Sequence, residues 1–156
     1  MRNSDTAVAK NVMTSPIVCV DTTDRLGDVE QRLVDAHVTG LPVVEGGRLV
    51  GIITRSDYVR IPILLKTYDE YVSSRQHEND LQQSDRTDFQ GFRSNLEALT
   101  VQDVMTRQVV TCTVDAPVKD IVSKMLNHHV HRIVVIDGDR PIGIVGSLDL
   151  IKLLQD

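Results

Sequence analysis

The sequence predicts an α/β (α+β) protein made of two tandem copies of one β-α-β-β-α repeat. Three observations support this expectation. The chain repeats itself at a fixed spacing, each copy alternates β-branched runs with an apolar run of helical spacing, and a glycine-containing turn separates two apolar runs in each copy. With 156 residues, of which 41% are hydrophobic and 25% charged, the composition is that of a globular chain that can bury a core.

The repeat is visible because Val12-Met13-Thr14 returns as Val104-Met105-Thr106, 92 positions later. The same spacing, without a gap, aligns identical or similar residues along both copies. The identical pairs include Val18 with Val110, Asp28 with Asp120, His37 with His129, Gly51 with Gly143 and Asp57 with Asp149. We therefore expect a first repeat over residues 8–66, a polar connector with a helical extension over 67–99, and a second repeat over 100–156.

Each repeat is expected to form a short strand, an amphipathic helix, a β-hairpin and a final helix. In the first repeat these elements are predicted at 17–20, around Leu26, Val29 and Leu33, at 41–44, at 49–53, and from Ser56 onward. In the second they are predicted at 109–114, around Val118, Ile121 and Met125, at 133–136, at 142–145, and from Leu148 onward. A three-stranded sheet with helices on one side leaves an apolar surface, so the two repeats are expected to pack as an internal pseudo-dimer.

A homodimer is also expected, because corresponding apolar helix faces in two repeats suit a twofold contact between chains. The residues expected to supply these faces are Leu26, Val29, Leu33, Val118, Ile121 and Met125. Residues 61–65, with Tyr68 and Tyr71, form an apolar stretch that fits either packing onto its own repeat or an extension of the dimer contact. Residues 73–95 are polar and are expected to form a solvated connector.

Charge and composition exclude several classes of protein. A net charge of −5 and a pI of about 5.5 argue against nucleic-acid binding, and the chain has no Trp for base stacking. No apolar run has the length of a membrane span, and residues 1–11 lack the apolar segment of a secretory signal. Cys19 and Cys112 lie in β-branched surroundings and are expected to be strand residues of a cytoplasmic protein.

The histidines at positions 128, 129 and 131 raise the question of a metal site. His129 aligns with His37 in the other repeat, and no further ligand set accompanies these residues. A zinc site needs several ligands that converge on one point. We therefore expect His129 to be a structural residue at a helix end, and we expect no metal site.

Thr54 and Asp57 lie where a predicted strand ends and a helix begins. One explanation is a capping box, in which both side chains satisfy free backbone donors at the helix start. The other is ligand binding, because a helix start attracts phosphate, a Thr hydroxyl can donate to it, and an Asp carboxylate can accept from both hydroxyls of a ribose. The residues alone leave both explanations open.

The ordered motifs resemble the CBS (cystathionine β-synthase) domain family, specifically the tandem pair called a Bateman module. In the first repeat they are Val12-Met13-Thr14, Thr39-Gly40-Leu41-Pro42-Val43-Val44 and Gly51-Ile52-Ile53-Thr54-Arg55-Ser56-Asp57. In the second they are Val104-Met105-Thr106, His131-Arg132-Ile133-Val134-Val135-Ile136-Asp137 and Gly143-Ile144-Val145-Gly146-Ser147-Leu148-Asp149. The resemblance implies a sensor that binds adenosine-type ligands (AMP, ADP, ATP, S-adenosylmethionine or NAD) between paired repeats and assembles as a disc-shaped dimer.

The resemblance, read together with the side-chain chemistry, places candidate ligand-binding residues in both repeats. Those in the first are Thr14, Ile17, Thr39, Gly40, Leu41, Pro42, Thr54, Arg55 and Asp57. Those in the second are Val109, His131, Arg132, Ile133, Val134, Ser147 and Asp149. The apolar members are expected to line adenine slots, although ordinary core packing explains each of them equally well.

The second repeat departs from the family pattern. Gly146 stands where the first repeat has Thr54, so one hydroxyl is lost, while Asp149 is kept and Ser147 is adjacent. His131-Arg132 stand where some relatives hold a phosphate, and an Arg suits this task as an always-charged planar donor. The first repeat has Thr39-Gly40 there. The two clefts are therefore expected to be unequal.

The leading functional expectation is a stand-alone regulatory module that binds an adenine nucleotide. We expect no enzyme, because the sequence contains no Ser/His/Asp set, no Walker A loop and no paired-carboxylate motif, and because its end at Asp156 is expected to leave no room for a catalytic domain. The alternative is a dimeric adaptor with empty clefts that regulates a partner protein. Neither a nucleic acid nor a membrane is expected as a partner.

Overall fold

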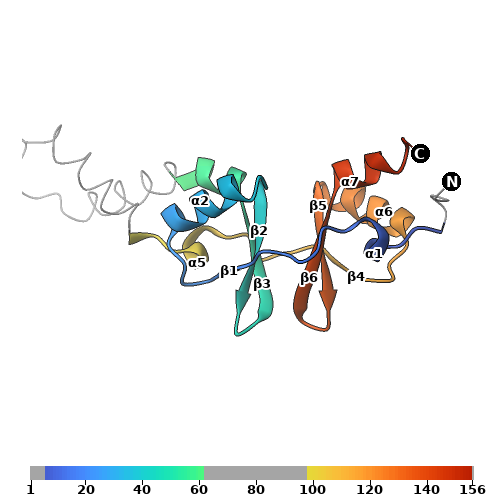
Figure 1. Cartoon of the computed structure of the whole chain (residues 1–156). Helices are drawn as coiled ribbons and strands as arrows, with labels where there is room; N and C mark the ends of the chain where they lie inside the picture. Colours follow the sequence, from blue (N-terminus) through green and yellow to red (C-terminus); the bar gives the residue numbers. More distant parts are fainter. Residues whose placement is uncertain (1–5, 62–97, 156) are drawn as a thin grey trace, which may run out of the picture. The chain divides into compact units, whose positions relative to one another are not determined.

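The computed structural model describes residues 6–61 and 98–155 and contains two compact units (Figure 1). The first-repeat unit comprises Val20–Leu41 and Ile53–Thr106, and the second-repeat unit comprises Met1–Cys19, Pro42–Ile52 and Arg107–Asp156. The units therefore alternate along the chain instead of following one another. In the described ranges, no helix combines the length and the apolar character needed to cross a lipid bilayer.

The first repeat forms a three-stranded sheet of β1 (Val20–Asp21), β2 (Gly40–Glu45) and β3 (Arg48–Thr54), in the order β1-β2-β3. The β2–β3 turn requires glycine, because Gly46 and Gly47 have φ values of 57° and 80°. Helix α2 (Leu26–Asp35) buries Leu26, Val29 and Leu33, at the spacing that predicts an amphipathic helix, and leaves Val34 exposed. A further helical segment covers residues 55–61.

Tyr58 ties that helical segment to α2. Its hydroxyl donates a hydrogen bond of 2.8 Å to the Leu26 carbonyl oxygen. Burial, together with the nearby Glu30 and Asp57 carboxylates, raises the pKa of Tyr58 to about 12, so the phenol stays protonated and keeps donating at all physiological pH values.

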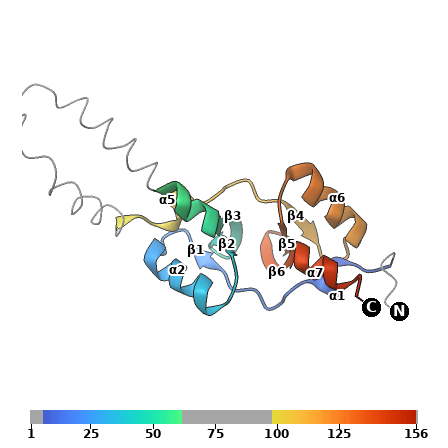
Figure 2. The same ribbon diagram turned by 90° about the horizontal axis from the view of Figure 1, so that it is seen from above.

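The second repeat forms the sheet β4-β5-β6, from β4 (Thr111–Thr113), β5 (Arg132–Asp137) and β6 (Arg140–Gly146). Strand β5 runs parallel to β4 and antiparallel to β6. Helices α6 (Val118–His128) and α7 (Ser147–Lys152) pack against the sheet, as Figures 1 and 2 show. The buried core cluster of this unit consists of Ala9, Cys112, Ile121, Met125, Ile133, Val135 and Val145.

The predicted fold class is confirmed, because each repeat contains a three-stranded sheet with helices in the predicted order. The opening strands are shorter than predicted, since β1 covers only Val20–Asp21 and β4 only Thr111–Thr113. The predicted connector over 67–99, including Tyr68 and Tyr71, falls almost wholly outside the described residues, as does most of the apolar stretch 61–65. The boundaries at 66/67 and 99/100 remain predictions.

The segment that leads into each repeat packs against the other repeat. Helix α1 (Ala9–Val12) precedes the first repeat, yet Ala9 N–H donates to the Ala116 carbonyl at 2.9 Å and Thr14 forms a β-bridge with Ile144. Helix α5 (Val101–Val104) precedes the second repeat, yet Val101 N–H donates to the Asp24 carbonyl at 3.0 Å. This exchange explains why the segment that contains α1 belongs to the second-repeat unit and why the first-repeat unit extends to Thr106.

Apolar burial holds both exchanged segments in place. Ala9 and Val101 are both fully buried. Gly143 lets the segment that follows α1 approach β6 closely, because a Cβ at position 143 would lie 2.6 Å from the Met13 sulfur. The free energy gained from these contacts is available only when the leading segment and the opposite repeat are both present.

The helix residues expected at a dimer contact are buried inside the chain. Leu26, Val29, Leu33, Val118, Ile121 and Met125 are each 8% exposed or less. The prediction that they supply an intermolecular face is therefore wrong, because they form the cores of their own units. Cys112 is also buried, as predicted, and Cys19 is half-buried, and burial raises the pKa of both thiols.

His37 and His129 end their helices in the left-handed conformation, each with φ of 52°. His129 is the C-cap of α6, where a left-handed residue closes the last turn. Both histidines are exposed. The prediction that His129 is structural is confirmed by this backbone geometry.

Replacing His129 by Gly tests this assignment. A non-glycine residue in the left-handed conformation destabilises the folded chain by about 1–2 kcal/mol, which glycine avoids. Glycine's greater conformational freedom in the unfolded chain offsets about 0.4–1 kcal/mol of this stabilisation. His129→Gly should therefore raise the free energy of unfolding by about 0.5 kcal/mol in urea denaturation. The matched variant His128→Gly, inside α6, should lower it by about 0.5–1 kcal/mol. Changes of the same sign in both variants would contradict the assignment.

Candidate functional site

The first polar cluster, here called the Asp57 cluster, comprises Thr39, Gly40, Thr54, Arg55, Asp57 and Thr106. Asp57 is 4% exposed. Its Oδ2 accepts hydrogen bonds from the Thr54 backbone N–H at 2.7 Å and from the Thr54 hydroxyl at 2.8 Å. Its Oδ1 accepts a longer bond, 3.3 Å, from the Thr106 hydroxyl. Of the predicted capping contacts, the bond from the Thr54 backbone N–H to Asp57 is thus present, and the two bonds from Thr54 share one carboxylate oxygen.

Thr39 and Gly40 form the opposite side of this cluster. The Arg55 N–H donates to the Thr39 carbonyl at 3.0 Å. The Thr39 hydroxyl oxygen is buried and makes no hydrogen bond among the described residues. A Cβ at Gly40 would lie 3.0 Å from Thr54 Cγ2, so a larger side chain at position 40 would need Thr54 to move.

The second cluster, here called the Asp149 cluster, occupies the same repeat positions and comprises Thr14, His131, Arg132, Gly146, Ser147 and Asp149. Asp149 Oδ2 accepts a hydrogen bond of 2.9 Å from the Gly146 backbone N–H. Its Oδ1 lies 3.4 Å from the Lys152 ammonium. The Ser147 N–H donates to the His131 carbonyl at 3.0 Å, and Thr14 pairs with Ile144 next to this end of β6.

Arg132 gives the Asp149 cluster a cation that the Asp57 cluster lacks at the equivalent position. Arg132 lies directly opposite Gly146 across the β5–β6 ladder. The side chain is half-buried. Burial lowers the pKa of the Arg132 guanidinium, and the charge of Asp149 partly offsets that effect. The guanidinium remains charged at neutral pH, with part of its hydration removed.

The apolar candidates differ in how accessible they are. Leu41, Pro42, Ile133 and Val134 are buried, and Ile133 belongs to the core cluster with Ile121 and Val145. Core packing explains these residues. Ile17 and Val109 are partly exposed. Val109 lines a small cavity of about 230 Å³ together with Leu49 and Thr111.

Thr106 is the cluster residue that the sequence reasoning missed. Its contact with Asp57 arises from the segment exchange, which carries the start of the second repeat to the first. A signal was present in the sequence, because Thr106 is the repeat counterpart of the candidate Thr14. Within residues 6–61 and 98–155, no group of three or more His, Cys, Asp or Glu side chains is arranged to hold a metal ion.

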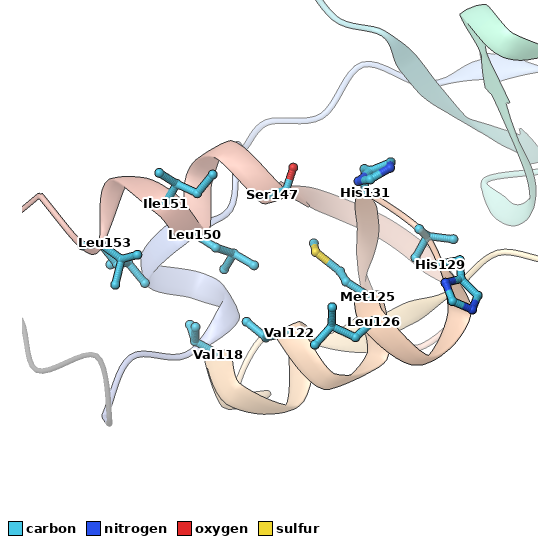
Figure 3. A pocket seen from close by; sticks show the side chains of 12 residues that line it. Val118, Val122, Met125, Leu126, His129, His131, Ser147, Leu150, Ile151 and Leu153 are labelled. Carbon is cyan, nitrogen blue, oxygen red and sulfur yellow. The ribbon is translucent and has the colours of Figure 1, made fainter.

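An apolar groove of about 540 Å³ lies between α6 and α7 (Figure 3). Val122, Leu126 and Ile151 line it and are 37%, 69% and 51% exposed. His131 and Ser147, both members of the Asp149 cluster, lie at one end of the groove. The groove is distinct in chemistry from the polar cluster, because aliphatic side chains dominate its lining.

Comparison with known proteins identifies relatives of the whole chain. The profile of the CBS domain family matches residues 9–63 and 101–156. Protein MJ1426 of Methanocaldococcus jannaschii is 30% identical over 161 residues, which cover 97% of this chain and 94% of that protein.

Solved structures of related domains share the fold. The CBS domain of a CBS-domain-containing membrane protein from Sphaerobacter thermophilus is 32% identical, with a TM-score of 0.73, and the match covers 97% of this chain and 90% of that one. The CBS domain pair of protein MJ0100, crystallised with 5′-methylthioadenosine and S-adenosyl-L-methionine, is 23% identical with a TM-score of 0.68, and the match covers 96% of each chain.

Alanine substitution of the two aspartates tests their structural roles. Asp57→Ala leaves a part-buried Thr54 N–H without its acceptor and should lower the free energy of unfolding by about 1–3 kcal/mol. Asp149 is more exposed, so water can replace it, and Asp149→Ala should cost about 0.5–1 kcal/mol. Urea denaturation of both variants measures the difference. Equal losses would show that burial of Asp57 does not strengthen its contacts.

Proposed function

Because this chain belongs to the CBS domain family, with one domain in each repeat, we propose that it is a regulatory module that binds adenosine-type ligands at the Asp57 and Asp149 clusters. The ligand class comprises AMP, ADP or ATP, with S-adenosylmethionine or NAD as further candidates. CBS domain pairs are regulatory modules, and the described residues contain no arrangement on which we would base a catalytic step.

The observation that carries this proposal is that the two carboxylate oxygens of each aspartate make hydrogen bonds of different length. In both clusters Oδ2 accepts a short bond from a backbone N–H, at 2.7 Å in one and 2.9 Å in the other. In both, Oδ1 has only a long contact, 3.3 Å to Thr106 and 3.4 Å to Lys152. A ribose hydroxyl can replace these weaker contacts without disturbing the cap. Capping and ligand binding are therefore compatible.

The relatives support the adenosine part of the ligand. The MJ0100 pair was crystallised with two ligands that both contain adenosine. An aspartate that accepts from ribose hydroxyls would serve any ligand of this class, and adenine recognition needs little beyond an apolar slot and backbone groups. Ile17 and Val109, which are partly exposed, are the candidates for such slots.

We propose further that the chain forms a homodimer through exposed apolar helix residues. Both repeats leave the same two positions apolar and exposed. Val34 corresponds to Leu126, and Val59 corresponds to Ile151, with exposures of 50%, 69%, 73% and 51%. Recurrence at the same places suits a twofold contact, in which one patch meets its own copy. The adaptor alternative uses the same groove for a partner protein and leaves the clusters empty.

Ligand binding is tested by thermal denaturation with AMP, ADP, ATP, NAD, S-adenosylmethionine and 5′-methylthioadenosine, each at millimolar concentration. A ligand that binds only the folded chain at 100 times its Kd adds about 2.7 kcal/mol to the free energy of unfolding, so the Tm should rise by several degrees. Guanosine monophosphate is the matched control for nonspecific effects. If no adenosine compound shifts the Tm or gives calorimetric heat, the sensor function fails and the adaptor alternative gains support.

The dimer is tested by light scattering after size-exclusion chromatography. The expected mass is twice that of the 17.4 kDa chain, about 35 kDa. Leu126→Glu and Ile151→Glu place a charge in the groove and should shift the mass toward a single chain. Lys119→Glu, at an exposed polar position of α6, should leave the dimer intact. A single-chain mass for the unaltered protein, with and without nucleotide, would reject the dimer.

A further inference from the structure

We propose that the thioether of Met13 is an oxidation site, and that its conversion to the sulfoxide by a peroxide releases the surrounding segment from strand β6. Met13 lies directly after α1 and directly before Thr14, in the segment that completes the second-repeat unit. The inference goes beyond the proposed function and does not depend on it. It rests on how closely this side chain packs, on how its segment is held, and on how accessible the other methionines are.

The Met13 side chain occupies the space that a side chain at position 143 would need. A Cβ on Gly143 would lie 2.6 Å from the Met13 sulfur and 3.1 Å from its Cγ, so only glycine lets the thioether lie against the β6 backbone. Met13 also packs against the core cluster that contains Ala9 and Val145. An oxygen atom bonded to this sulfur would put a polar group among close apolar contacts, which destabilises them.

The segment that carries Met13 is held to β6 by a few hydrogen bonds. The Thr14 N–H donates to the Ile144 carbonyl at 2.9 Å, and the Ile144 N–H donates back at 3.2 Å. The Ser15 hydroxyl donates to the Ile142 carbonyl at 3.1 Å. Thr14 and Ser15 are exposed, so water competes for these bonds once the packing beneath them is lost. Oxidation of Met13 therefore opens the pairing as well as the packing.

The sulfur-containing side chains of the described residues differ in how easily a peroxide reaches them. Met105, the repeat counterpart of Met13, is 8% exposed and Met125 is 7% exposed, whereas Met13 is partly exposed. Burial raises the pKa of the Cys19 and Cys112 thiols, so the thiolate that reacts with peroxide is scarce at neutral pH. Met13 is therefore the side chain that a peroxide should oxidise first.

The reaction transfers one oxygen atom from hydrogen peroxide to the Met13 sulfur. A sulfur lone pair attacks the peroxide, the O–O bond breaks, and water leaves, so the sulfur loses two electrons and the peroxide gains them. The resulting sulfoxide is polar, and a methionine sulfoxide reductase supplied with a dithiol returns it to the thioether. The segment is thus docked in the reduced chain and released in the oxidised chain, and the change is reversible.

The test treats the full chain with hydrogen peroxide and follows each methionine by peptide mass spectrometry. Met13 should gain an oxygen atom at least about tenfold faster than Met105 or Met125. The Tm should fall by several degrees as Met13 is oxidised, and the amide signals of Thr14 and Ile144 should shift. Treatment with a methionine sulfoxide reductase and dithiothreitol should restore both the Tm and the signals.

Variants separate Met13 from the other oxidisable side chains. Met13→Leu keeps the apolar volume and has no sulfur, so its Tm should not change with peroxide. Met13→Gln, a polar side chain of similar length, should lower the Tm without peroxide. Met105→Leu, Met125→Leu and the double variant Cys19→Ala/Cys112→Ala should keep the loss of Tm on oxidation.

Three results would overturn the proposal. The first is oxidation of Met105 or Met125 before Met13. The second is complete oxidation of Met13 with no change in the Tm or in the Thr14 and Ile144 signals. The third is an equal loss of Tm in peroxide-treated Met13→Leu. A loss that follows Met13 oxidation, is absent from Met13→Leu and is reversed by the reductase supports it.

Discussion

The exchange of leading segments is the constraint on which the rest of this structure depends. Each repeat lacks a part of its unit until the segment in front of the other repeat completes it, with Ala9 buried in one core and Val101 in the other. The same exchange brings Thr106 to Asp57 and pairs Thr14 with Ile144. The segments that complete the two units are therefore the same segments that complete the polar clusters. A single repeat, cut from the chain, would lose both.

The two repeats share their backbone contacts and differ in the side chains of their polar clusters. Backbone contacts recur at corresponding positions, such as Arg55 to Thr39 and Ser147 to His131, both at 3.0 Å. Both aspartates cap the start of a helix through Oδ2. The side chains around them differ in size and charge, so the two polar clusters are chemically unlike.

Much of this could be predicted from the sequence because the repeat constrains two copies at once. The helix and strand order, the Thr54–Asp57 cap and the role of His129 follow from local patterns whose physics is local. The exchanged segments could not be predicted, because nothing local in Val12-Met13-Thr14 shows which repeat it joins. The sequence predicts the dimer face at Leu26 and its counterparts, because periodicity identifies the most apolar side of a helix. In the structure that side is buried in the core. The exposed apolar residues, such as Leu126 on α6 and Ile151 on α7, are found only once burial is known.

The proposed function depends on the binding of adenosine-type ligands at these two clusters. The most direct measurement is an amide NMR titration of the isotope-labelled chain, first with AMP and then with adenosine. The proposed function predicts that AMP or adenosine shifts the amide signals of residues in the two clusters, such as Thr54 and Arg55 or Arg132 and Ser147. Signals that stay unchanged at both clusters while others move would contradict it.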